Sequence, residues 1–195
     1  MPVEIEAKMK LDDDHRMADL LLQHGAVSLG QFLETDAFYD TPDRSLLASD
    51  QGLRIRVSRN LATGQSHCTL THKGPNQPGQ LKTRDETELL VDNPDAAATL
   101  LQRLGFVRCL SFQKRRHSWR LDDCRIELDQ LPLLGSFIEI EGPAEGSILR
   151  IRDALGLADR PLISTPYIAI LSNYMKIQDR SPATEFRFPE PSPAP

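Results

Sequence analysis

The sequence predicts an α+β fold of about eight short, mostly antiparallel strands with helices packed on them. Two observations support this fold class. Runs that alternate apolar and charged residues recur along the chain and are separated by short, turn-rich segments, a pattern typical of antiparallel strands. Amphipathic stretches with helix-capping residues lie between some of these runs, and their apolar stripes need a sheet face to pack on.

The alternating runs set the expected strands, because successive side chains on a strand point to opposite faces. Turn-rich pieces such as "RNLATGQS" and "GPNQPGQ" separate them. The strands are expected over residues 3–11, 36–40, 52–58, 67–73, 82–89, 111–121, 124–130 and 136–142.

Four segments predict helices. Asn93 and Pro94 provide an N-cap and a first helical residue before "DAAATLLQRLGF", and Gly105 provides a stop. Residues 12–14 cap "HRMADLLLQHG", which ends at Gly25. The third and fourth helices are expected in "GSILRIRDALGL" and "STPYIAILSNYMK".

The length of 195 residues suits one well-buried domain, which we place at residues 1–177. The chain then becomes rich in proline and poor in apolar anchors, as in "DRSPATEFRFPEPSPAP". This composition predicts a disordered tail over residues 178–195.

Charge and cysteine usage exclude several classes of protein. A formal net charge of −5 argues against a general nucleic-acid binder. The three cysteines are an odd number without CxxC spacing, so neither a disulfide framework nor a structural zinc site is expected. No signal peptide or membrane-spanning apolar run is recognisable. We therefore expect a cytoplasmic protein without membrane or nucleic-acid partners.

Charged residues of like sign share one face of most of the expected strands. In "VEIEAKMKL" Glu4 and Glu6 share a face with Lys8, and in "GLRIRVS" Arg54 aligns with Arg56. The same pattern recurs in Lys82, Arg84, Glu86 and Glu88, in Lys114 and Arg116, in Arg125, Glu127 and Asp129, and in Glu139 and Glu141. Like charges on one face repel, so this repetition points to a purpose besides sheet stability.

Two arrangements fit these faces. The helices must cover the apolar faces, which leaves the charged faces turned away from them. If the sheet is open, the charged faces meet water, a common arrangement for antiparallel sheets. If the sheet closes, they line the interior of a barrel. Recurrent pairs of carboxylates and guanidiniums suit a polyanion bound with Mg²⁺ or Mn²⁺, which favours the barrel.

The motifs that carry these charges resemble one known family. "EIEAK" at residues 4–8 looks like the ExExK signature of the CYTH domain, found in the triphosphate tunnel metalloenzymes. "TDAFYDTPDRSLLASDQGLRIRV", "LTHKGP", "RDETE", "KRRHSW" and "LDQLPLLGSFIEIEG" follow in the order of that family. The resemblance covers about residues 1–175 and implies an eight-stranded antiparallel β-barrel, the triphosphate tunnel, with helices packed outside.

The resemblance also implies roles for the charged residues. Metal ligands would be Glu4, Glu6, Asp129, Glu139 and Glu141, joined by Glu86 and Glu88 as ligands of a second ion or as partners of the basic residues. Substrate-binding residues would be Lys8, Arg54, Arg56, Lys73, Arg84, Lys114 and Arg116. Of these, Lys8, Arg54, Arg56 and Lys73 would also be catalytic. The implied cofactor is Mg²⁺ or Mn²⁺.

Within this family the sequence is most similar to the class IV adenylyl cyclases, because the first strand reads "EIEAKM" and "LTHKGP" follows. The implied reaction converts ATP to cyclic AMP and pyrophosphate. Hydrolysis of tripolyphosphate, thiamine triphosphate or a nucleoside triphosphate is the alternative, and a polyphosphate-binding module without activity is the third. The expected partner is a triphosphate-containing small molecule, bound by a monomer or a homodimer.

Overall fold

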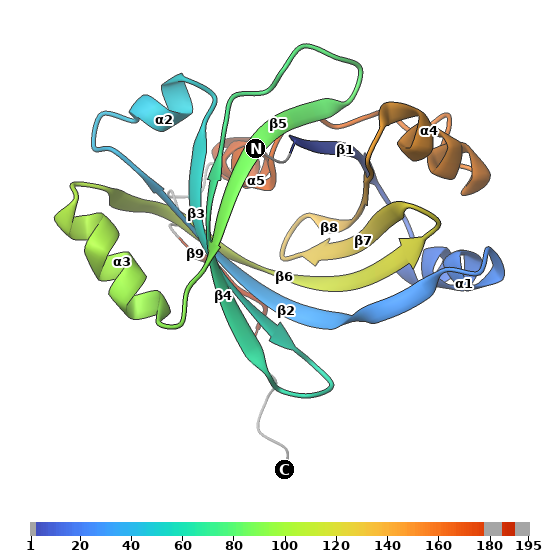
Figure 1. The fold of residues 1–195 in the computed structure, drawn as a ribbon, viewed down its shortest axis with the longest axis horizontal. Coiled ribbons are helices and arrows are strands. Elements are labelled where there is room, and N and C mark those ends of the chain that lie inside the picture. Colours follow the sequence, from blue (N-terminus) through green and yellow to red (C-terminus); the bar gives the residue numbers. More distant parts are fainter. Residues whose placement is uncertain (1–2, 178–184, 190–195) are drawn as a thin grey trace.

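The computed structural model describes residues 3–177 and 185–189, and a closed antiparallel barrel forms its centre (Figure 1). Its strands are β1 (Val3–Lys10), β2 (Val27–Asp40), β3 (Gly52–Asn60), β4 (Ser66–Lys73), β5 (Lys82–Leu90), β6 (Val107–Leu121), β7 (Cys124–Leu131) and β8 (Gly135–Glu141). They pair in the order β2-β3-β4-β5-β1-β8-β7-β6, and β6 returns to β2. The predicted α+β barrel is therefore confirmed, and an open charged sheet is excluded.

The barrel closes through the pairing of β2 with β6, which runs from Val27 opposite Arg120 to Asp40 opposite Val107. The sequence predicted only residues 36–40 of β2 as strand, and this was wrong. Alternation is hidden in the first half of β2, where the pairing register shifts beside Gly30. Gly30 has a φ of +123°, which a side chain would disfavour.

In the part of the chain that the structure describes, five helices lie outside the barrel: α1 (Asp14–Gln23), α2 (Ser45–Ala48), α3 (Pro94–Arg103), α4 (Glu145–Ala154) and α5 (Tyr167–Ile177). Four of them match predicted helices. The short α2 was not predicted, because the hydrogen bonds that hold its first turn go to Asp40, which lies outside the helix at the end of β2. The Asp40 carboxylate accepts hydrogen bonds from the backbone N–H groups of Leu46 (3.0 Å) and Leu47 (3.1 Å).

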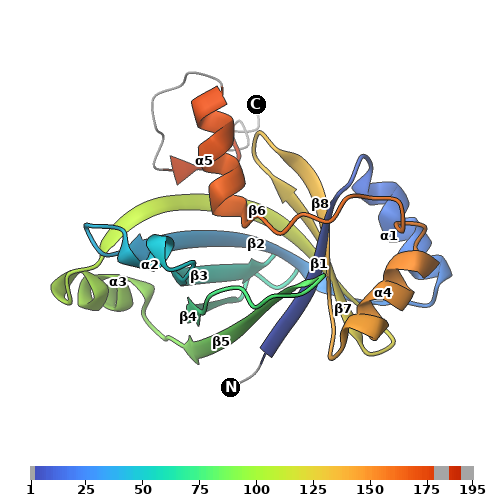
Figure 2. The ribbon, with the colours of Figure 1, turned by 90° about the horizontal axis from the view of Figure 1, so that it is seen from above.

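Helices α1 and α4 lie on one side of the barrel and α3 on the opposite side (Figures 1 and 2), and each side has an apolar cluster. On one side α1 and α4 pack on the outer faces of β1, β6, β7 and β8, with Leu21 and Ile148 meeting Trp119 and Ile138. On the other side α3 buries Leu101 against β3 and β4. The helices thus cover the apolar faces of the strands, as predicted. The charged faces of the strands point into the barrel.

Helix α5 is placed differently, across one end of the barrel (Figure 2). Tyr167, Leu171 and Met175 pack against Phe112 and Phe137. These two phenylalanines lie two residues from Lys114 and Glu139 on the same strand faces, so they also point inward. The interior is therefore charged along most of its length and apolar where α5 covers it.

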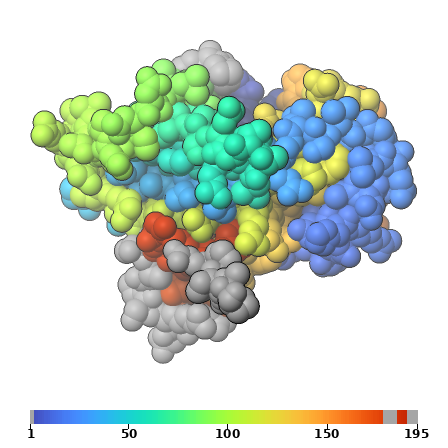
Figure 3. Space-filling model, turned by 90° about the horizontal axis from the view of Figure 1, so that it is seen from below, coloured from blue at the N-terminus to red at the C-terminus, as the bar shows by residue number. Residues whose placement is uncertain are grey.

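A further strand, β9 (Glu185–Phe186), pairs in parallel with β6 at Ser111 and Phe112. Phe186 joins the apolar cluster of α5, and Figure 3 shows these residues in red against the yellow-green surface of the barrel. This strand lies inside the segment 178–195, for which disorder was predicted. Residues 178–184 and 190–195 of that segment lie outside the described residues.

Two simpler expectations concern cysteines and membranes. Cys68, Cys109 and Cys124 are free thiols, as their spacing suggested. Within residues 3–177 and 185–189, no helix has the length and apolar character needed to cross a bilayer.

Leu171→Ala tests how strongly α5 is attached. Leu171 is fully buried in the cluster at the barrel end, and removal of a buried leucine side chain leaves a cavity. We expect the free energy of unfolding, measured by urea denaturation, to fall by about 2–5 kcal/mol. Asn173→Ala, at an exposed position of the same helix, is the control. Equal stability of both variants would contradict the packing described for α5.

Candidate active site

Strand pairing brings charged residues from distant parts of the sequence together inside the barrel. On β1, Glu6 lies opposite Lys82 of β5 and opposite Glu141 of β8. Lys8, two residues later, lies opposite Glu139. Because alternate side chains share a face, Glu4, Glu6 and Lys8 meet Lys82, Glu139 and Glu141 in the interior. The prediction that the like-charged faces line a barrel is confirmed.

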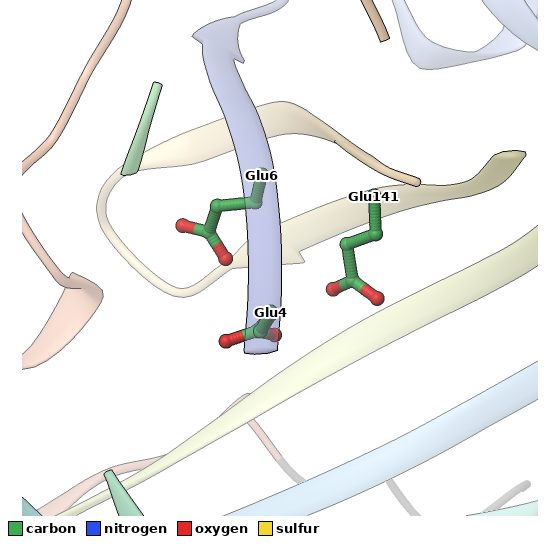
Figure 4. A group of neighbouring side chains, drawn as sticks. All are labelled: Glu4, Glu6 and Glu141. Carbon is green, nitrogen blue, oxygen red and sulfur yellow. The ribbon is translucent and has the colours of Figure 1, made fainter. Parts of the chain in front are cut away.

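Three carboxylates converge at one place in this interior: those of Glu4, Glu6 and Glu141 (Figure 4). One oxygen from each lies within 4.8 Å of the others. Two of the residues are alternate positions of β1, and the third is directly opposite Glu6 on β8. These are three of the carboxylates that the resemblance assigned to a metal ion.

The pKa values of Glu4, Glu86 and Glu141 are shifted in different directions in this crowded interior. Burial, together with the charges of Glu4 and Glu139, raises the pKa of Glu141 to about 8. Burial also raises the pKa of Glu86 to about 7, helped by a hydrogen bond with Glu4. Burial opposes ionisation of Glu4 too, but the hydrogen bond from Glu86 and the charges of Lys73 and Lys82 lower its pKa to about 2.

This donor set fits a divalent cation. Hard carboxylate oxygens are the ligands that Mg²⁺ and Mn²⁺ prefer. Among the described residues Glu141 forms no ion pair, although it lies beside Glu4 and Glu6. A bound cation would offset the repulsion that raises the pKa of Glu141. Glu4, Glu6 and Glu141 are therefore the residues that would hold a metal ion.

Lysine side chains connect this carboxylate cluster to the rest of the interior. The Nζ of Lys73 is 3.0 Å from Glu4 and also contacts Glu86. The Nζ of Lys82 is 2.6 Å from Glu6. Lys8 lies between Glu6, at 3.4 Å, and Glu139, at 3.3 Å. Three ammonium groups thus lie within contact of the carboxylates that would hold the metal.

A second group of charges is built around Asp129 on β7. Arg116 donates two hydrogen bonds to its carboxylate, at 2.7 and 2.6 Å, and Lys114 donates one at 2.9 Å. Arg116 also donates to Glu139 at 2.7 Å. Lys114 is 3.4 Å from Glu34 on β2. The structure therefore places Asp129 and Glu139 among cations, and neither belongs to the group of three converging carboxylates.

A third group joins β2 and β3. Arg56 donates two hydrogen bonds to Asp36, at 2.6 and 2.7 Å, and lies 3.1 Å from Glu34. Arg54 is held more loosely, 3.7 Å from Asp36 and 3.3 Å from the hydroxyl of Thr71. Bidentate pairs fix a guanidinium firmly, so Arg54 is the arginine of this group that is freer to take another partner.

Two predicted site residues lie at the margin of this interior. Arg84 is buried, but it donates to the carboxylate of Asp50 at 2.8 Å and to the backbone oxygens of Asp50 and Gly74, which belong to loops. Glu88 is exposed and accepts a hydrogen bond from Thr71 at 2.9 Å. Glu88 is not one of the three carboxylates that converge.

Some interior residues were not proposed as site residues from the sequence. Lys82 and Glu127 were recognised as members of charged faces but given no role. Glu34 was missed because β2 was expected to begin at residue 36. Extending the alternation backwards through "FLETDAFYD", where Glu34 and Asp36 share a face, would have found it.

Asp36→Asn tests how far these buried charges depend on one another. Asp36 is 2% exposed and pairs with Arg56 and Arg54. Removing its charge leaves Arg54 without its ion-pair partner and Arg56 with Glu34 alone, so at pH 7 we expect a loss of about 3–5 kcal/mol in the free energy of unfolding. Denaturant titration of the variant and of Asp19→Asn, an exposed control, measures it.

The same loss should depend on pH. Burial opposes ionisation of Asp36, but the charges of Arg56 and Arg54 lower its pKa below the usual 3.8. A carboxylate with a lowered pKa stabilises the fold above its unfolded pKa, and this contribution disappears as the pH falls through the folded pKa. The difference between wild type and Asp36→Asn should therefore shrink below about pH 4. A difference that is constant from pH 3 to pH 7 would contradict the assignment.

Comparison with known proteins places this geometry in a family. The model of the CYTH domain matches residues 2–154. The adenylate cyclase CyaB of Aeromonas hydrophila is 30% identical over 139 residues, which cover 70% of this chain and 67% of that protein. The PH1819 protein of Pyrococcus horikoshii has a TM-score of 0.77 at 27% identity, covering 88% of this chain and 99% of that one.

A third relative shares the fold. HpAC1 of Hippeastrum, reported to have a dominant triphosphatase activity, has a TM-score of 0.66 at 20% identity, and the match covers 89% of this chain and 96% of that one. The family model spans most of the chain. The ExExK residues of β1 lie on the strand face that points into the barrel. The chain belongs to the CYTH domain family.

Proposed function

We propose that this protein is a divalent-metal-dependent enzyme that processes a triphosphate substrate inside its barrel. The single observation that carries the proposal is the convergence of Glu4, Glu6 and Glu141 beside a set of buried cations. A cation held by these carboxylates would neutralise phosphate charge and polarise the phosphoryl group. Carboxylates alone would repel a triphosphate, so the adjacent lysines and arginines are needed to bind it.

Substrate binding in such a site requires the basic side chains to change partners. Lys8 lies 3.3–3.4 Å from its carboxylates and Arg54 lies 3.7 Å from Asp36, so these pairs are weaker than the bidentate ones. Lys73 bridges two carboxylates whose charges a cation would offset. We assign Lys8, Arg54 and Lys73 to direct contact with phosphoryl oxygens.

The more firmly held cations have a different part in this proposal. Arg56 and Arg116 each form a bidentate pair with a buried aspartate, and Lys114 shares Asp129 with Arg116. They supply positive potential from fixed positions, as preorganised electrostatic stabilisation requires. Arg84, held by loop oxygens, would meet the substrate only at the margin of the interior. No Ser, Cys or His nucleophile is needed for phosphoryl transfer of this kind.

Two reactions use this machinery. In a cyclase, the ribose 3′-hydroxyl of ATP attacks the α-phosphate and pyrophosphate leaves. In a triphosphatase, water attacks the terminal phosphate, the bond to the diphosphate portion breaks, and inorganic phosphate is released. The 30% identity to a protein named adenylate cyclase favours the first. The triphosphatase activity reported for HpAC1, a protein of the same fold, favours the second. We place the cyclase reaction first and the hydrolase reaction as its alternative.

Parallel incubation of the full chain with ATP, tripolyphosphate and thiamine triphosphate tests the proposal. Each substrate is supplied with Mg²⁺ or Mn²⁺, and cyclic AMP, pyrophosphate and phosphate are quantified. We expect one of the triphosphates to be consumed only when a metal is present. Cyclic AMP with pyrophosphate identifies the cyclase, and phosphate release identifies the hydrolase. Tight binding of a triphosphate without any product would contradict an enzymatic function.

Glu141→Gln tests the assignment of the metal ligands. The substitution keeps the size of the side chain but removes the charge that a hard cation needs, so we expect turnover to fall by about two orders of magnitude or more. Calorimetric titration with Mn²⁺ should show weakened binding, and Glu4→Gln should behave alike. Glu145→Gln, outside the barrel at the start of α4, is the control. Wild-type turnover of both barrel variants across metal concentrations would refute the assignment.

A further inference from the structure

We propose that Tyr167, the first residue of α5, is an additional substrate-binding residue whose hydroxyl donates a hydrogen bond to the phosphoryl group held by Lys8, in the positive potential of the fixed Lys114 ammonium. This inference rests on the proposed function, because it concerns the same triphosphate. It adds a contact from outside the barrel strands to a site otherwise built from them.

Packing fixes the orientation of the Tyr167 ring. It meets Phe137 edge-on, with ring centroids 5.1 Å apart and planes at 70°, and Phe112 at 6.4 Å and 81°. One turn further along α5, Leu171 is fully buried in the same cluster. The ring itself is 7% exposed. A side chain held in this way has little freedom left to lose when a ligand binds.

Two cations of the interior lie over this ring. The Nζ of Lys8 is 4.4 Å from the ring centroid of Tyr167, and the Nζ of Lys114 is 5.5 Å from it. Lys8 also donates a hydrogen bond to the backbone oxygen of Thr165, two residues before the tyrosine. The start of α5 is therefore in direct contact with side chains that we assign to the triphosphate site.

The Tyr167 hydroxyl has no hydrogen-bond partner among the described residues, although it is fully buried. A buried hydroxyl without a partner costs free energy, and a phenylalanine would pack equally well against Phe112 and Phe137. Burial, and the charges of Glu139 and Asp129, raise the pKa of Tyr167 well above its usual value. The hydroxyl thus stays protonated and can donate to an anionic oxygen.

The position of Tyr167 also indicates which phosphoryl group it contacts. Phe112, Leu131 and Phe137 point inward at this end, together with α5. A phosphate chain that continued past them would bury charge among apolar side chains, which is strongly unfavourable. The group beside Lys8, Lys114 and Tyr167 is therefore the free terminal phosphate of the substrate.

Tyr167→Phe tests the hydroxyl alone, because it keeps the ring and its packing. Loss of a hydrogen bond to a charged group should weaken tripolyphosphate binding, measured by calorimetry, by roughly 10- to 100-fold. The value of kcat/KM should fall by a similar factor. The melting temperature should stay equal or rise, since the hydroxyl has no partner to lose. Tyr174→Phe, on the same helix, is the control and should change neither tripolyphosphate binding nor kcat/KM.

The possible outcomes distinguish a failure of the Tyr167 assignment from a failure of the proposed function. If Tyr167→Phe binds tripolyphosphate as tightly as wild type, the hydroxyl assignment is overturned while the proposed function stands. If the wild type binds and processes no triphosphate, both are overturned. A lower melting temperature with unchanged affinity would show a purely structural tyrosine and also overturns the assignment.

The terminal-phosphate assignment has its own probe. Diadenosine triphosphate carries the same three phosphates as ATP but has a nucleoside at both ends. A second nucleoside would have to enter the end of the interior where Phe112 and Phe137 pack against α5. We expect wild-type protein to bind ATP at least tenfold more tightly, as one lost charged contact implies. Equal affinity for both ligands would overturn this part of the inference.

Discussion

The structure depends on the mutual neutralisation of charges inside a closed barrel. A buried carboxylate or ammonium would be unfavourable alone, and most of those inside the barrel are acceptable because strand pairing supplies a partner of opposite charge. Arg116, Asp129 and Lys114 illustrate this, since all are at most 8% exposed and form one network. Helices outside the barrel carry the hydrophobic stabilisation, which leaves the interior available for polar chemistry. The division of labour follows from the two-residue period of the strands.

The metal ligands and the phosphate-binding cations of the proposed site constrain one another. Lys73 touches Glu4 and Glu86, and Lys82 touches Glu6, so changing the charge at one position changes the balance at several others. This coupling explains why individual residues are poorly described as purely metal-binding or purely substrate-binding. It also means that a cation and a polyanion entering together disturb the balance less than either one alone.

The sequence predicted the parts of this arrangement that depend on local pattern. Alternation in "VEIEAKMKL" and "GLRIRVS" gave the correct inward faces, and the Asn93 cap gave the correct start of α3. Closure of the barrel was not decided by alternation, since an open sheet has the same pattern; the resemblance decided it. The pairing of Glu6 with Glu141 and the placement of Tyr167 depend on tertiary contacts, which local patterns do not encode. The start of β2 was lost where Gly30 interrupts its pairing.

The pairing of β1 in the middle of the sheet order has a consequence for folding. Glu6 comes from the first strand and Glu141 from the eighth, and they become neighbours only when β8 pairs with β1. Such pairings between distant parts of the chain form slowly. No partly folded or prematurely terminated chain that lacks β8 can assemble the three-carboxylate cluster. In the proposed function, affinity for a divalent cation at this cluster would therefore report complete folding, because the cluster needs the last barrel strand in place.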